Sequence, residues 1–214
     1  MVVAEAAVEP LRAPLVTPPL RRLGEDFQKQ SPIAVIEGAK GTGKTLIFRF
    51  LVEQETWRGA LRTLHHQISP EIVAPIIPVY GSSQGAHMVD LIGNRTRALA
   101  KEYGTSDPMQ FSELKRRIQD SLRGAFTEAQ WADFWLDAIA WVCGIGVGKS
   151  GAWQDFLSTA KARGDHPIAL FEGLEEVILD PYTDSKQAVA LRSLLVDIPL
   201  RLRQEVGRPI NKLW

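Results

Sequence analysis

The stretch "GAKGTGKT", residues 38–45, follows the apolar run "IAVIE", residues 33–37. It matches the pattern G-x-x-x-x-G-K-[ST], in which a glycine-rich loop surrounds phosphate groups. Glycines let consecutive backbone N–H groups point into one concavity, and a following helix N-terminus adds unsatisfied donors and a favourable dipole. The run before the loop is typical of a buried strand, and "TLIFRFLVEQ", residues 45–54, has helical spacing. Strand, glycine loop and helix in this order predict a phosphate-binding loop.

Each position of this loop has an expected role. The Lys44 ammonium would reach the β- and γ-phosphates of a nucleotide, and the Thr45 hydroxyl would bind Mg²⁺. The backbone of the loop would supply the remaining donors. The residues expected to contact the nucleotide are Gly38, Ala39, Lys40, Gly41, Thr42, Gly43, Lys44 and Thr45.

A second stretch, "CGIGVGKS" at residues 143–150, resembles the first only in part. Gly148, Lys149 and Ser150 match the pattern, but Cys143 stands where its first glycine is required. The stretch also follows a long helical segment and not a strand. We therefore interpret it as a flexible loop that ends a helix, and not as a second phosphate site.

Composition limits the classes of protein to consider. A chain of 214 residues is long enough for one α/β domain with a helical insertion. The formal net charge of zero gives no bulk attraction to nucleic acid, and no run of about 18 apolar residues predicts a membrane span. The single cysteine excludes an intrachain disulfide, and the acidic N-terminus is unlike a signal peptide. These features favour a cytoplasmic protein.

The chain divides into an arm and a domain. Residues 1–22 are rich in proline and are predicted to form an arm or linker, followed by one nucleotide-binding domain over residues 23–214. A second strand is expected in "VAPIIPVYG", residues 73–81, where two prolines favour a sheet edge. Residues 85–165 are expected to be a mostly helical insertion.

Three helices are expected within the insertion. One covers residues 88–104 and ends at Gly104, and a second lies within residues 111–126. The sequence "TEAQ", residues 127–130, is a capping box that opens the third. Its stripe of apolar residues has a helical period and is predicted to be core, not a base-stacking surface: Trp131, Phe134, Trp135, Ala138, Ile139 and Val142. The basic run "LKRR", residues 114–117, is interpreted as a solvated helix face.

The segment "PIALFEGLEEV", residues 167–177, adds a cluster of acids. Four apolar residues predict a buried strand that delivers Glu172 at its carboxyl end, where open α/β sheets bind ligands. Glu172 would hold Mg²⁺ through its water shell, and Glu175 or Glu176 would polarise the attacking water.

The loop and the acidic segment together resemble the P-loop NTPases of the group that includes AAA-type and STAND (NACHT-like) ATPases. In the STAND branch the second motif typically reads as four apolar residues followed by D-G-L-D-E. By position, Glu172 corresponds to the metal-binding acid, and Glu175 and Glu176 to the acidic pair that follows it. Because Mg²⁺ tolerates little deviation from octahedral geometry, glutamate in place of aspartate predicts slow hydrolysis. The resemblance covers only the core elements and not residues 85–165.

The resemblance implies a three-layer α/β sandwich with a parallel sheet. After the acidic segment, "SKQAVALRSLLVDI" predicts a helix stopped by Pro199, and "LRLRQEVG" predicts a second short helix. In the resembled fold the next strand lies between the strands that carry the two motifs. Here it would begin at Ile210, so either the chain is truncated or the sheet is completed in another way.

The expected function is Mg²⁺-dependent ATP binding with slow hydrolysis, used as a conformational or assembly switch in a signalling or defence ATPase. The resemblance implies a homo-oligomer or a protein partner. Two alternatives remain open: a nucleotide-binding scaffold that has lost hydrolysis, and a small-molecule or nucleotide kinase. A kinase would need a basic lid near the γ-phosphate, and the sequence offers no closer candidate than "LRLRQ", residues 200–204. The absence of an N-K-x-D motif favours ATP over GTP.

Overall fold

The computed structural model describes a mixed α/β protein that is mostly helical and contains a two-stranded parallel sheet. The residues that it describes are 18–28, 32, 34–36, 41–64, 74–82, 86–104 and 106–206. Within these ranges no helix combines the length and the apolar character that crossing a bilayer requires.

The sheet consists of β1 (Ile76–Tyr80) and β2 (Ile168–Phe171), with Ile76 opposite Ile168. The pairing shifts register between Pro78 and Tyr80, and it ends where the Glu172 N–H donates to the Tyr80 carbonyl at 2.9 Å. Every residue of β1 is buried because helices pack on both of its faces. The strand predicted within residues 73–81 is thus confirmed.

The crossover between the two parallel strands is helical, as predicted for residues 85–165. It contains α4 (Ala86–Tyr103), α5 (Phe111–Arg123), α6 (Glu128–Val142) and α7 (Ala152–Arg163). The predicted helix end at Gly104 is confirmed, and this glycine is required by close packing: a Cβ there would lie 2.4 Å from the Cys143 carbonyl oxygen.

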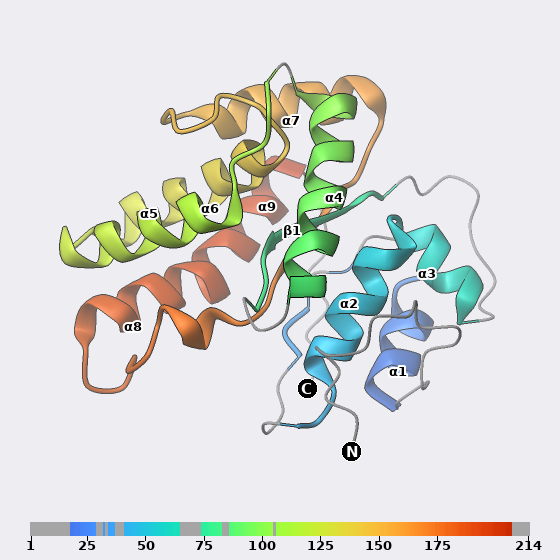
Figure 1. Ribbon diagram of the computed structural model, residues 1–214, viewed down its shortest axis with the longest axis horizontal. Coiled ribbons are helices and arrows are strands. Elements are labelled where there is room, and N and C mark those ends of the chain that lie inside the picture. Colours follow the sequence, from blue (N-terminus) through green and yellow to red (C-terminus); the bar gives the residue numbers. More distant parts are fainter. Residues whose placement is uncertain are drawn as a thin grey trace.

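The hydrophobic core has two parts that meet at the sheet (Figure 1). The smaller part contains α1 (Pro18–Asp26), α2 (Lys44–Gln54) and α3 (Trp57–Thr63), which lie to one side of β1. The larger part surrounds α6, whose predicted aromatic stripe is buried as expected. Trp131 and Trp135 stack there with ring centroids 5.3 Å apart, and the Trp135 indole N–H donates to the Ala190 carbonyl.

The C-terminal part of the described chain continues through α8 (Ser185–Arg192), the π-helical turn η3 (Ser193–Asp197) and α9 (Ile198–Val206). The prediction that Pro199 stops the helix is therefore wrong. A proline inside an α-helix would clash with the carbonyl four residues earlier. The wider π turn immediately before α9 relieves that clash, so the helical path continues beyond the proline.

Two further predictions need correction. The predicted N-terminal arm, residues 1–22, overlaps α1, because Leu20 and Leu23 bury their side chains in the smaller core. In the predicted strand at residues 33–37, residues 34–36 have no strand structure, and Val35 is 46% exposed. In the described part of the chain, the sheet offers this segment no hydrogen-bonding neighbour. The strand predicted from Ile210 lies outside the described residues.

The capping box predicted at the start of α6 is present and supports a stability prediction. The Thr127 hydroxyl accepts from the Gln130 N–H at 3.3 Å, and the Gln130 side chain accepts from the Thr127 N–H at 2.9 Å. Thr127→Ala should therefore cost about 1 kcal/mol of unfolding free energy. In thermal denaturation the midpoint should fall by about 2–4 °C.

Thr159→Ala is the matched control, because Thr159 lies inside α7 and its hydroxyl donates to the Asp155 carbonyl of the same helix. It should leave the midpoint unchanged or raise it slightly, since alanine has the higher helix propensity. Equal midpoints for the parent chain and Thr127→Ala would show that this cap contributes nothing.

Candidate nucleotide-binding site

The described part of the glycine loop has the backbone expected of a phosphate-binding loop. Gly41 and Gly43 have φ angles of 87° and 91°, in the left-handed region that favours glycine. Helix α2 begins at Lys44, and its N-cap residue, Gly43, provides no side-chain cap. A helix N-terminus that follows a glycine loop is a common place for proteins to bind an anion. Residues 38–40, predicted to contact the nucleotide, lie outside the described residues.

The glycine loop and the acidic segment meet in space. The Thr45 hydroxyl donates to Glu172 Oε1 at 2.8 Å, although the two residues are 127 positions apart. Glu172 lies directly after β2, and Thr45 lies in the first turn of α2. The two residues predicted to bind Mg²⁺ are therefore neighbours.

Ser82, which lies just after β1, links the carboxylates of Glu172 and Glu176. The Ser82 N–H donates to Glu172 Oε2 at 3.0 Å, and the Ser82 hydroxyl donates to Glu176 Oε1 at 3.0 Å. Gly173 makes this approach possible. Its φ angle is 72°, and a Cβ there would lie 2.7 Å from the Ser82 nitrogen. The glycine in "EGLEE" is thus required both by its backbone angle and by close packing.

The two acids that follow differ in environment. Glu175 and Glu176 lie in the short 3₁₀ turn η2 (Leu174–Glu176), in which Glu175 is exposed. The Glu176 carboxylate contacts Lys115 of α5, with Nζ and Oε2 2.9 Å apart. The phenol of Tyr80 lies buried at the adjoining end of β1, and its pKa is raised by burial and by the negative charges of Glu176 and Glu175. The acidic cluster therefore places its negative charge at the carboxyl end of β1.

The residues at this site suit Mg²⁺. Thr45 and Glu172 place two hard oxygen atoms side by side, so the Thr45 hydroxyl would bind the ion and Glu172 would hold it through its water shell. Within the described ranges, no group of three or more His, Cys, Asp or Glu side chains forms a metal site. Mg²⁺ commonly takes only one or two protein ligands and completes its shell with water and substrate phosphates.

The second glycine-rich stretch is a helix-ending loop, as predicted. Helix α7 follows this loop, and a carboxylate of the same chain binds at its N-terminus. The Asp137 carboxylate accepts from the backbone N–H groups of Gly151 and Trp153, both at 2.9 Å. Burial raises the pKa of Asp137, and the backbone hydrogen bonds oppose this shift. A carboxylate in this place would compete with any phosphate for the same N–H groups.

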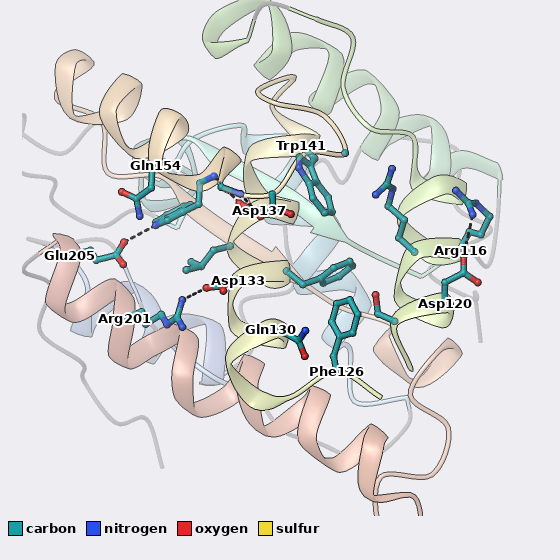
Figure 2. A pocket seen from close by; sticks show the side chains of 18 residues that line it. Arg116, Asp120, Phe126, Gln130, Asp133, Asp137, Trp141, Gln154, Arg201 and Glu205 are labelled. Carbon is teal, nitrogen blue, oxygen red and sulfur yellow. Dashed lines mark hydrogen bonds and ion pairs between the residues drawn. The ribbon is translucent and has the colours of Figure 1, made fainter. Parts of the chain in front are cut away.

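A hollow of about 700 Å³ lies elsewhere, between α5, α6, α7 and α9 (Figure 2). Several of its charged side chains have partners within the hollow. Arg201 contacts Asp133, Glu205 accepts from the Trp153 indole N–H, and Arg116 contacts Asp120. Arg201 belongs to the segment considered as a kinase lid, and its pairing with α6 disfavours that role.

Comparisons of the chain with protein-family models, with curated proteins and with solved structures found no match. Sequence reasoning missed Ser82. It also wrongly placed Lys115 on a solvated helix face, whereas the Lys115 side chain is 29% exposed and contacts Glu176. Ser82 could have been found as a polar residue directly after a parallel strand, at the edge of the sheet where ligands bind. Lys115 carried no signal that separates it from its basic neighbours.

Proposed function

We propose that the chain binds ATP with Mg²⁺ and hydrolyses it slowly, as a conformational or assembly switch of the kind used by signalling and defence ATPases. The observation that carries the proposal is the hydrogen bond between Thr45 and Glu172. Each residue belongs to a motif with its own expected role in holding Mg²⁺. A chance glycine loop and an unrelated acidic turn have no reason to meet at these two atoms.

The proposed roles follow from position. The backbone of residues 41–45 and the Lys44 ammonium hold the phosphates, and Thr45 and Glu172 hold Mg²⁺. When bound, Mg²⁺ neutralises charge on the phosphate oxygens. Glu176 orients the attacking water, because Ser82 connects its carboxylate to that of Glu172. Helices on both sides of the β1–β2 pair support a three-layer P-loop sandwich as the proposed architecture.

Steady-state phosphate release separates this proposal from a scaffold that only binds nucleotide. We expect slow, Mg²⁺-dependent release of phosphate from ATP by the purified chain. Binding of ATP without turnover would favour the scaffold. ADP formation that requires an added hydroxyl-bearing acceptor, with the phosphoryl group transferred to that acceptor and not released as phosphate, would favour a kinase.

The proposed metal role of Glu172 gives a separate prediction. Glu172→Gln removes the anionic charge but keeps the shape, so the gain in ATP affinity on adding Mg²⁺ should fall by at least about fivefold. Titration calorimetry with and without Mg²⁺ measures this gain. Glu128→Gln is the matched control, because Glu128 contacts Arg192 on another part of the surface. An unchanged Mg²⁺ dependence in Glu172→Gln would remove this residue from the metal site.

A further inference from the structure

The acid proposed to orient water is held by the helical insertion. Glu176 Oε1 accepts from Ser82 at the end of β1, and Oε2 contacts Lys115 of α5. The side chains of Lys115 and Glu176 are 29% and 11% exposed, so this contact is shielded from solvent to a greater degree than an ordinary surface pair.

We propose that Lys115 is a positioning residue for Glu176, which makes α5 part of the catalytic arrangement. The inference rests on the proposed function, in which Glu176 orients water. Two donors from different elements fix the carboxylate: Ser82 bonds one oxygen and Lys115 the other.

The neighbours of Lys115 support a specific role for it. Arg116 and Arg117, which follow it on α5, contact acids of their own helix, Glu113 among them. Lys115 instead reaches across to a residue 61 positions away. The Lys115–Glu176 contact therefore links the helical insertion to the carboxyl end of the sheet. The rate of nucleotide hydrolysis would thus depend on the position of α5 relative to Glu176.

The test replaces the ammonium and keeps the length of the side chain. Lys115→Met should lower kcat for ATP hydrolysis by about tenfold, part of the roughly 10²-fold that a positioned general base supplies. Its ATP affinity should remain within about twofold of the parent value, since Lys115 is not among the proposed nucleotide contacts. Lys115→Arg should recover at least half of the parent kcat because it keeps a cationic donor at this position. Arg116→Met is the matched control on α5 and should hydrolyse ATP at the parent rate.

A double variant distinguishes positioning from a general loss of structure. If Lys115 acts through Glu176, then Lys115→Met combined with Glu176→Gln should be no slower than Glu176→Gln alone. Parental turnover by Lys115→Met, equal losses in Arg116→Met, or multiplicative losses in the double variant would each overturn the inference and leave the proposed function standing. Absence of turnover in the parent chain would overturn both hydrolysis and this inference. Absence of ATP binding would overturn the proposed function itself.

Discussion

Replacing Glu176 by glutamine should lower ATP hydrolysis by roughly 10²-fold and leave ATP affinity nearly unchanged. The amide keeps the shape of the side chain and can still accept from Ser82, but it lacks the negative charge that polarises water. Single-turnover phosphate release measures the chemical step, and titration calorimetry measures the affinity. A lower rate of the chemical step with an unchanged ATP affinity identifies a residue that acts on the reaction and not on nucleotide binding.

Glu175→Gln is the matched control, because Glu175 lies in the same 3₁₀ turn but is exposed. It should retain most of the parent rate. A large loss in Glu175→Gln with little loss in Glu176→Gln would exchange the two roles. If both variants hydrolyse ATP at the parent rate, neither acid takes part in the reaction.

Replacing Lys44 by alanine should weaken ATP binding by at least about tenfold, or about 1.4 kcal/mol. Lys44 is the charged side chain that the loop pattern directs to the β- and γ-phosphates, and it is the first residue of α2. Titration calorimetry with Mg²⁺-ATP measures the loss. Circular dichroism shows whether the helices of the variant are intact.

Lys101→Ala is the control for a general loss of positive charge. Lys101 is exposed in the last turn of α4, away from the glycine loop in sequence and on a different helix. It should bind ATP as the parent chain does. Equal affinities for the parent and Lys44→Ala would rule out the glycine loop as the place where phosphates bind.

Local patterns predicted several of the helices, although α1 was expected to be part of an arm and α3 was not expected. The capping box at Thr127 and the aromatic stripe of α6 depend on spacings within one helix, and both appear as expected. The glycine loop and the helix that follows it at Lys44 could also be predicted, because the positions of the loop glycines are set by local backbone requirements. The apolar segment that ends at Phe171 forms β2, although only Ile168 is fully buried in it.

Features that depend on distant packing were harder to predict. A five-residue apolar run such as 33–37 fits a strand, but forming one requires a neighbour that its own sequence does not reveal. The helical path across Pro199 depends on the π turn before it and on contacts of α9 with α6, such as Arg201 with Asp133. Ser82 and Lys115 reach Glu176 across 94 and 61 positions, respectively. The position of Ser82 after a strand could have indicated it, but no local pattern could indicate Lys115.

The central claim is that the Thr45–Glu172 pair belongs to a nucleotide site, and one titration tests it most directly. The purified chain is titrated with ATP in the calorimeter, with Mg²⁺ and again with a chelator in place of Mg²⁺. We expect saturable binding of one ATP per chain that is tighter when Mg²⁺ is present. No saturable binding at up to about 1 mM ATP with Mg²⁺ would contradict it.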